Sequence, residues 1–426
     1  MPDGSSTVHL FRPKLITIFR EGYGAEDFHK DVLAALTVAI VALPLSMAFA
    51  IASGVPPAHG LYAAIVGGFL VSALGGSRFQ IGGPAGAFIV LVAATVASHG
   101  VEGMLLTVLL SGMLLTLLGL VRLGSLIRHI PHAVTVGFTA GIALIILASQ
   151  LKELGGLTLA GAEPGPFLPK LAALGAALPT LNPAALAVGL GVVLAIMAVR
   201  RWRPAWPALL LAVTGASLAA ALLHLPVETI ASRFGELPHS LPRPALPALT
   251  PERIVAVLPS VFAFTLLGGV ESLLSAKVAD SMTGRRHRSN MELVAQGIAN
   301  IGSALFGGMP VTGTIARTAT NVRAGAKSPL SGMMHAIFLL LFMLVAAPLA
   351  GYVPLAALAG MLVVVAWNMA EKAEFARLLR QPYAASVLLT TFAVTLLRDL
   401  TEGIIAGCLL AAVLAFLRHK VPEEGA

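Results

Sequence analysis

The sequence predicts an all-α polytopic membrane protein with 14 transmembrane segments arranged as a 7+7 inverted repeat. Three observations predict it: the composition, the charge of the loops and short motifs that recur in the two halves. Of the 426 residues, 57% are hydrophobic and 11% are charged, and the mean hydropathy is +0.89. Soluble domains carry about 25% charged residues, so this composition excludes a soluble protein.

Apolar segments follow one another along almost the whole chain after a polar lead. They fall at 31–52, 57–75, 84–98, 101–121, 131–151, 184–200, 205–224, 254–276, 290–306, 311–324, 329–349, 354–370, 383–397 and 401–418. Segments three and ten are too short to cross about 30 Å of hydrocarbon as helix alone, so we expect a short extended piece to lead each one. Residues 1–30 form the lead, with an amphipathic stretch near 15–19, and residues 419–426 form a short tail.

Loop charge supports this count of segments. With a cytoplasmic N-terminus, roughly 21 Lys and Arg side chains lie inside and about six outside. The sequence therefore predicts a multi-pass protein of the inner (plasma) membrane with both termini in the cytoplasm. The same topology explains the net charge of +8 without nucleic acid, because the basic residues are dispersed between apolar segments. The single cysteine, Cys408, excludes a disulfide framework.

Three short motifs recur in the same order in the two halves. The pairs are Gly83-Pro84 with Met309-Pro310, residues 130–133 and Gly137 with residues 353–356 and Gly360, and residues 182–185 before Arg200 with residues 381–384 before Arg398. Seven segments per repeat is an odd number, so the second half must enter the membrane from the opposite side. The halves are therefore predicted to form an inverted repeat.

Two broken segments carry the polar residues expected of a binding site. Residues 307–327 contain Gly, Pro, four Thr, Asn and Arg317, and residues 81–88 combine glycine, proline and small residues before an apolar run. Pro310 and Gly313 leave backbone N–H groups free at the start of the next helix, where anions bind, and Arg317 lies one turn further along. Matched breaks of this kind indicate a transporter's binding site. The predicted anion-binding residues are Gly83, Pro84, Ala85, Gly86, Ala87, Phe88, Thr312, Gly313, Thr314, Ile315, Ala316 and Arg317.

Glu271 is the only carboxylate placed well inside a segment. An unpaired charge there costs at least about 2.5–3.5 kcal/mol, so Glu271 needs a proton, a cation or an ion pair with Lys277 or Arg317. Ser275 shares its helical face. We expect Glu271, Ser275 and Thr314 to couple transport to a cation. No cofactor is expected, and no metal beyond Na⁺ at Glu271.

Other polar residues are interpreted more simply. Gln80, His132, His335 and Asn368 lie near segment ends and are expected at the interface, whereas Asn290, Gln296 and Asn300 are expected to make interhelical hydrogen bonds. The patterns HExxH, GxSxG and GxxxxGK[ST] do not occur, so neither an intramembrane hydrolase nor an ATPase has support. We expect no enzymatic activity.

Together these residues resemble the sulfate permease (SulP) family of anion transporters, to which the solute-carrier family 26 exchangers belong. The resemblance is carried by residues 42–50, Gly54, Pro57, 60–62, 80–88, 271–275, 279–280, 316–321 and 325–327. It covers nearly all of residues 30–418 and looks closest to bacterial members that carry bicarbonate or dicarboxylates.

The resemblance implies a core domain of 31–121 and 254–349 and a gate domain of 131–224 and 354–418. It implies an anion held between broken spans three and ten, and a homodimer. The acidic position in span eight of the family binds sodium or governs proton coupling; here it is Glu271, and a glutamate favours protons. The family's span-ten arginine corresponds to Arg317.

The chain departs from the family pattern at three places. Ala316 replaces a small polar residue, Leu45 stands where the family often has glutamine, and only Arg418–Ala426 follow the last span, where relatives usually carry a STAS domain. The first departure removes a hydroxyl contact that some relatives have, and the second leaves no side-chain amide there to contact the substrate. The chain is either a natural short form or one truncated after its membrane domain.

The sequence thus predicts a secondary active transporter of sulfate, bicarbonate or dicarboxylate anions, coupled to H⁺ or Na⁺, in which core moves against gate as in an elevator. Its partners would be the anion, the lipid bilayer and a second copy. Three alternatives stay open: an uncoupled anion channel, a nucleobase carrier of the same architecture and a non-transporting scaffold or sensor. An uncharged substrate would leave Arg317 without a role, and a scaffold has no reason to bear buried charges.

Overall fold

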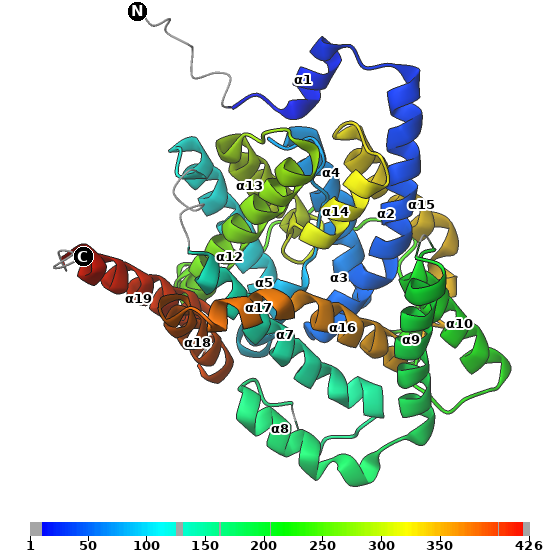
Figure 1. Cartoon of the computed structure of the whole chain (residues 1–426). Coiled ribbons are helices and arrows are strands. Elements are labelled where there is room, and N and C mark those ends of the chain that lie inside the picture. The colour runs from blue at the N-terminus through cyan, green and yellow to red at the C-terminus, as the bar shows by residue number, and fades with distance from the viewer. Residues whose placement is uncertain (1–10, 125–130, 162, 205, 399, 421–426) are drawn as a thin grey trace, which may run out of the picture.

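The helices of the chain gather into two groups (Figure 1). The computed structural model describes residues 11–124, 131–161, 163–204, 206–398 and 400–420. The first part of the predicted lead, the last six residues of the tail and position 130 of the repeat motif lie outside these ranges. In Figure 1, α14 lies beside α2 and α4 in the upper part of the view, whereas α7, α8 and α18 lie in the lower part.

Group A, as we call it, surrounds α14. It contains α2 (Ala25–Ala52), α3 (Pro57–Tyr62), the π-helical turn η2 (Ala63–Gly67), α4 (Gly68–Leu74), the 3₁₀ turn η3 (Gly86–Phe88), α5 (Ile89–Leu120), α12 (Pro251–Thr283), α13 (Ser289–Leu305), α14 (Ile315–Arg323) and α15 (Leu330–Ala350). Within it α13 and α12 pack along α5, and α15 packs along α2 and α4. The strands β1 (Gly82–Gly83) and β2 (Thr312–Gly313) lie between these helices.

Group B packs around α7 and α16. It contains α7 (His132–Gly155), α8 (Phe167–Ala176), the turn η4 (Leu178–Thr180), α9 (Pro183–Trp202), α10 (Ala208–Leu222), α16 (Leu355–Met369), α17 (Lys372–Leu379), α18 (Pro382–Leu397) and α19 (Leu400–Lys420). Fewer contacts join the two groups, chiefly those of α10 and α16 with α2 and of α5 with α7.

Length and hydropathy support a membrane protein. In the described ranges, eight helices are long and apolar enough to cross a bilayer, and four shorter apolar helices accompany them. The helical, polytopic fold class is therefore confirmed. The count of 14 spans and the inverted order of the halves stay predictions.

The recurring proline motifs mark helix starts in both halves. Pro131 and Pro354 occupy the N-cap positions of α7 and α16, and both have extended backbone, with ψ of 139°. Pro183 and Pro382 are the first residues of α9 and α18. Proline suits these positions because the first helical N–H groups have no acceptor within the helix. The repetition of local structure follows directly from the sequence.

Gly100 divides α5 into two helical pieces. Its φ of 68° and ψ of −176° interrupt the helical backbone between Ile89 and Leu120. Glycine adopts positive φ without steric penalty, so the chain can change direction here. The break lies between the predicted segments 84–98 and 101–121, as the sequence indicated.

On one face of the molecule, α1 (Lys14–Glu21) rests against group A, where the amphipathic stretch was expected. The Lys14 N–H donates to Gly75 O at 2.9 Å, and Arg78 Nη2 lies 2.7 Å from the Glu21 carboxylate. Burial, followed by the nearby Arg288 and Arg78 charges, lowers the pKa of Lys14 to about 8. We call this side the α1 face.

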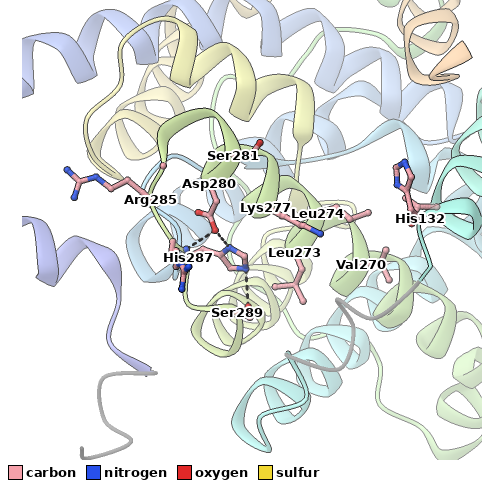
Figure 2. A pocket seen from close by; sticks show the side chains of 13 residues that line it. His132, Val270, Leu273, Leu274, Lys277, Asp280, Ser281, Arg285, His287 and Ser289 are labelled. Carbon is pink, nitrogen blue, oxygen red and sulfur yellow. Dashed lines mark hydrogen bonds and ion pairs between the residues drawn. The ribbon is translucent and has the colours of Figure 1, made fainter. Parts of the chain in front are cut away.

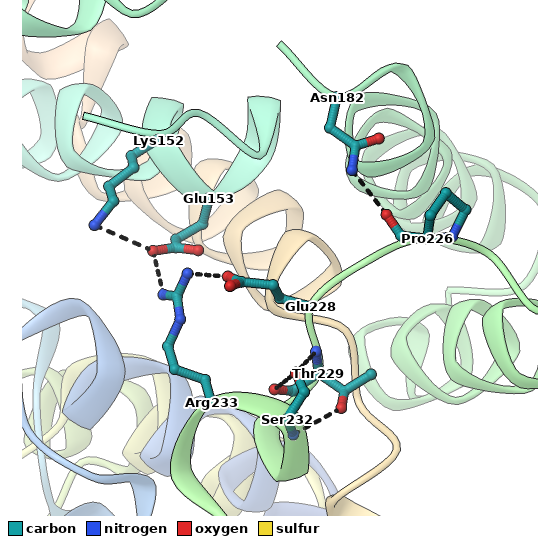
Figure 3. Close-up of polar contacts among 8 residues, drawn as sticks. All are labelled: Lys152, Glu153, Asn182, Pro226, Glu228, Thr229, Ser232 and Arg233. Carbon is teal, nitrogen blue, oxygen red and sulfur yellow. Dashed lines mark hydrogen bonds and ion pairs between the residues drawn. The ribbon is translucent and has the colours of Figure 1, made fainter. Parts of the chain in front are cut away.

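The segment around α11 (Ile230–Phe234) is hydrogen-bonded to the connection between α15 in group A and α16 in group B. The segment before and within α11 bonds to the α15–α16 link: Ile230 N donates to Val353 O at 3.0 Å, and Leu355 N donates to Glu228 O at 2.9 Å. Arg233 then pairs with Glu228 and, at 2.6 Å, with Glu153 of α7 (Figure 3). The link that leaves group A is therefore tied to a helix of group B.

Candidate functional site

The two broken segments meet as a pair of antiparallel strands. Gly82 pairs with Gly313 and Gly83 with Thr312, so the short extended pieces expected before segments three and ten are confirmed. Ile81 extends the pairing on both sides: its carbonyl accepts from Thr314 N at 3.0 Å, and its N–H donates to Thr318 Oγ1 at 3.1 Å. Residues far apart in sequence are thereby held in one register.

Two amides of α13 support β2 from the side. Asn300 Oδ1 accepts from Val311 N at 2.9 Å, and Asn300 Nδ2 donates to Val311 O at 2.8 Å. Gln296 Nε2 also donates to Val311 O, and Ser272 Oγ of α12 donates to Gln296 Oε1 at 3.1 Å. Buried backbone groups need such partners. The interhelical bonding expected of Gln296 is confirmed by its bond to Ser272. Asn300 bonds the segment before β2 and its own helix instead, and Asn290 Oδ1 is buried without a hydrogen-bond partner in the described ranges.

Arg317 is the charged group at this strand pair. It is the third residue of α14 and only 3% exposed. It therefore lies in the first turn, not one turn further, because the helix begins at Ile315. Nη2 donates to Pro84 O at 3.0 Å, while Nη1 is buried without a hydrogen-bond partner among the described residues. No carboxylate in these ranges lies within ion-pair distance. A buried cation in this state is strongly disposed to bind an anion.

Two glycines make room for polar side chains here. A Cβ on Gly83 would lie 2.2 Å from Arg317 Nη1, and one on Gly313 would lie 1.6 Å from Gln80 Nε2. A side chain at either position would displace the polar group that lies there. Gly83 therefore leaves space for the guanidinium of Arg317, and it also adopts the positive φ that the backbone has at this position.

The site opens at the first turn of α14. Residues 81–89 are buried throughout, whereas Ile315 is 38% exposed and Ala316 is exposed too. The first N–H of α14 that bonds back along the chain is that of Thr318, to Thr314 O at 2.9 Å. The N–H groups of the first turn therefore have no acceptor within the helix. Thr314 N, by contrast, is used by Ile81 O, which corrects the expectation that it is free to bind an anion.

Glu271 lies on α12 next to this arrangement. Its Oε2 is buried without a hydrogen-bond partner, and no ion pair with Lys277 or Arg317 is present in the described ranges. The alternative of a structural ion pair is therefore not observed. Ser275, one turn along, donates its hydroxyl to Thr318 Oγ1 at 3.0 Å and so links the helix of Glu271 to the helix of Arg317.

The predicted cation-coupling residues are brought together only in part. The Thr314 hydroxyl donates to Ile81 O at 3.3 Å, and no hydrogen bond within the described ranges joins it to Glu271 or Ser275. The carboxylate and hydroxyl oxygens of Glu271 and Ser275 are of the type that Na⁺ accepts. In the same ranges, no group of three or more His, Cys, Asp or Glu side chains gathers as a metal site.

Gln80 and His335 are not interfacial, which corrects the expectation from their places near segment ends. Gln80 is 3% exposed and donates from Nε2 to Ser272 Oγ at 2.8 Å, directly behind Gly313. His335 is fully buried, and neither ring nitrogen has a partner in the part of the chain that the structure describes. Hydropathy cannot reveal this burial because it depends on which other segments pack over these positions. His132 and Asn368, by contrast, are exposed as expected.

Two carboxylates in the described ranges, Asp31 and Glu292, are fully buried, although the sequence singled out only Glu271. Asp31 accepts from Lys327 N at 2.6 Å and Ser328 N at 3.1 Å, and Glu292 accepts from Ser77 N at 2.8 Å. Both stand in the first two turns of a helix and bond a glycine- and serine-containing loop from another part of the chain. Such carboxylates hold the loops that follow α14 and precede β1.

The turn η3, which follows β1, contacts group B. A Cβ on Gly86 would meet Ile146 of α7 and Met369 of α16 at 3.6 and 3.4 Å, and Phe49 of α2 at 3.4 Å. Phe88 turns the other way, edge-on to Phe264 of α12 with ring centroids 5.5 Å apart. The site therefore lies at the boundary between the two groups. A buried arginine between two broken helices, within a bundle of apolar helices, defines a multi-pass membrane protein of the transporter class.

Comparison with known proteins identifies the family. The model of the sulfate permease family matches residues 28–391, and the chain belongs to this family. YvdB of Bacillus subtilis, named as a candidate sulfate transporter, is 44% identical over 402 residues, which span 94% of this chain and 75% of YvdB. The bicarbonate transporter BicA of Picosynechococcus is 29% identical over 91% of this chain and 70% of its own length.

Solved structures agree on the fold. The transmembrane domain of a cyanobacterial bicarbonate transporter BicA superposes with a TM-score of 0.79 at 29% identity, covering 91% of this chain and 98% of that one. The murine anion transporter Slc26a9 in its inward-facing state gives 0.89 at 18% identity, covering 99% of this chain and 73% of that one. The latter likeness supports the fold alone.

Proposed function

We propose that this chain is a secondary active transporter that carries a small anion, either sulfate, bicarbonate or a dicarboxylate, in symport with H⁺ or Na⁺. The observation that carries the proposal is the buried guanidinium of Arg317, with no acidic partner among the described residues and a free Nη1 at the paired broken helices. A buried charge without a counter-charge is costly, and a substrate anion would supply the counter-charge.

The anion is proposed to bind at the open side of the first turn of α14. Pro84 O accepts from Nη2 and so orients the guanidinium, which leaves Nη1 for the anion. The N-terminus of α14, and in the other half the N-terminus that starts at Gly86, add positive dipole ends. Backbone N–H groups and one arginine suit an oxyanion without demanding one particular shape.

Coupling is proposed to run through Glu271. The Ser275–Thr318 hydrogen bond joins its helix to that of Arg317, so protonation of the carboxylate and occupancy by an anion affect the same helix pair. We favour H⁺ over Na⁺ for a glutamate. Na⁺ would instead use the oxygens of Glu271 and Ser275.

Movement is proposed to carry group A as the core, residues 31–121 and 254–349, against group B as the gate, residues 131–224 and 354–418. The site lies at the boundary of the two groups, so a shift of one against the other changes which side the anion can reach. The ion pairs of Arg233 with Glu228 and Glu153 would fix the connection between α15 and α16 to group B during this movement. A homodimer with cytoplasmic termini completes the proposal.

The test is uptake of labelled bicarbonate, sulfate and fumarate into proteoliposomes, with and without an inward proton or sodium gradient. Accumulation of one anion only with a gradient supports coupled transport and identifies both substrate and cation. Passive equilibration with anion currents would favour a channel. Uptake of uracil without any of these anions would favour a nucleobase carrier.

A second test addresses coupling. Glu271→Gln removes the titratable group and keeps the shape, so anion binding should persist while the gradient no longer drives accumulation. Glu252→Gln is the matched control, because Glu252 is exposed on the same helix. Gradient-driven uptake at the wild-type level in Glu271→Gln contradicts the coupling role.

A further inference from the structure

A separate cavity of about 660 Å³ lies between the two groups on the α1 face (Figure 2). Its wall on group A is one side of the last turns of α12, from Val270 to Ser281, together with the turn that leads to Ser289. Its wall on group B is the start of α7, with His132 and Thr135. The α1 face is identified by Arg288, at the end of that turn, whose Nη1 donates to Arg12 O at 2.7 Å.

The lining carries uncompensated positive charge. Lys277 is exposed and has no ion pair among the described residues, and the same holds for the side chains of Arg285 and Arg286. In Figure 2, Lys277 extends along α12 on the side toward His132, whereas Arg285 reaches the opposite way.

The acidic groups around the cavity are already engaged. Asp280 accepts from His287 N at 3.0 Å and lies 2.6 Å from His287 Nδ1. On the side of α7, His132 Nε2 lies 2.8 Å from Glu374 of α17, which also pairs with Arg377. No ion pair in the described residues joins either carboxylate to Lys277. The lining holds three cations, Lys277, Arg285 and Arg286, against one carboxylate, Asp280, which favours a positive potential in the cavity.

The cavity is distinct from the strand-pair site. Lys277 is six residues beyond Glu271 on α12, about 9 Å along the helix axis. It is nine residues beyond Gly268, whose carbonyl accepts from Thr312 Oγ1, which corresponds to about 14 Å. Apolar Val270 and Leu273 line the interval. None of the lining residues belongs to 81–88 or 311–318, so the residues that would hold an anion in the cavity differ from those of the strand-pair site.

We infer that this cavity is a second anion site, which holds a hydrated oxyanion at the mouth on the α1 face before it reaches Arg317. The inference rests on the proposed function in that both sites take the same class of anion. Its volume far exceeds one bare oxyanion, and a lysine ammonium is a strongly hydrated point charge, so the anion keeps much of its water and binds weakly. Because α12 of group A and α7 of group B both line the cavity, its affinity for the anion depends on the relative position of the two groups.

The test is equilibrium dialysis of the purified full chain against labelled sulfate and, in parallel, labelled bicarbonate. In the Arg317→Ala variant we expect the tighter site to disappear and one weaker site to remain. Adding Lys277→Gln and Arg286→Gln should remove that weaker site. Loss of all binding in Arg317→Ala, while the wild type binds, overturns the second site and leaves the proposed function standing.

The remaining outcomes separate the two proposals. Unchanged binding in Arg317→Ala contradicts the central site and with it the proposed function. No binding of either anion to the wild type overturns both proposals for these anions. Because Lys277 and Arg286 are exposed, these substitutions leave packing intact.

A kinetic readout tests the same inference in transport. In the Lys277→Gln, Arg286→Gln variant, KM measured from the α1 face should rise about fivefold and lose most of its dependence on ionic strength, with kcat unchanged. Because the transport equilibrium links kcat/KM in the two directions, kcat/KM from the opposite face should fall by the same factor. Arg253→Gln, exposed at the far end of α12, is the control. A KM from the α1 face equal to that of the wild type overturns the inference.

Discussion

The two broken segments share a backbone pattern and differ in chemistry. Residues 81–88 are buried throughout and carry only apolar side chains and glycines. Residues 311–318 carry three threonines and Arg317, and expose Ile315 and Ala316. The first half supplies space and a carbonyl, through Gly83 and Pro84; the second supplies charge and the opening. A second cation opposite Arg317 would repel it at close range, so a single charged half suits a single anion.

The largest effect is expected at the charged half. Arg317→Ala should weaken anion binding about a hundredfold, equivalent to about 2.7 kcal/mol, because it removes both the charge and the Nη1 donor. Arg317→Lys should lose about tenfold, since one ammonium cannot bond Pro84 O and present a second fixed donor to the anion. Dissociation constants by equilibrium dialysis measure both. Equal affinities for Arg317→Ala and wild type would show that Arg317 does not bind the anion.

The next effect is expected at the apolar half. Gly83→Ala places a Cβ 2.2 Å from Arg317 Nη1 and should displace the guanidinium, with a loss of affinity of about tenfold. Gly161→Ala is the control, because a Cβ added at Gly161 meets nothing within 4 Å among the described residues. The same dialysis measures both variants. Wild-type affinity in Gly83→Ala would mean that the first half does not position the arginine.

The hydrogen bonds of Asn300 to Val311, beside the charged half, should contribute to the stability of the protein. Asn300→Ala leaves Val311 N and O without their Asn300 partner and should lower the free energy of unfolding by about 1–3 kcal/mol. Asn368→Ala, at an exposed position, should have little effect. Thermal unfolding in detergent compares the two. A midpoint for Asn300→Ala that equals that of Asn368→Ala contradicts the supporting role.

The smallest effect concerns the contact of α1 with the loop before β1. The pKa of Lys14 is about 8 when α1 is docked and ordinarily 10.5. Between these values the undocked state binds more protons than the docked state, so docking should strengthen as pH rises from 8 to 10.5. Hydrogen exchange of the α1 amides, corrected for intrinsic rates, measures this. Lys14→Gln should flatten the trend and Lys30→Gln, on α2, should keep it; a trend that persists in Lys14→Gln contradicts the assignment.

Composition and local backbone chemistry were enough to predict the membrane class, the helix starts at Pro131, Pro183, Pro354 and Pro382, and the two broken segments around Arg317. Each of these features depends on neighbours in the chain, so no knowledge of packing is needed. The same local reasoning placed Glu271 in a span and expected the extended pieces that became β1 and β2.

The contacts of these groups, by contrast, could not be predicted from the sequence and depend on the tertiary structure. The contact of Arg317 with Pro84 O joins residues 233 positions apart. The use of Thr314 N by Ile81 O, the burial of Gln80 behind Gly313 and the burial of Asp31 by the loop after α14 arise in the same way. Hydropathy and motif spacing describe each segment alone. Which donors are satisfied, and which cation is left without a partner, depends on how segments from the two halves pack together.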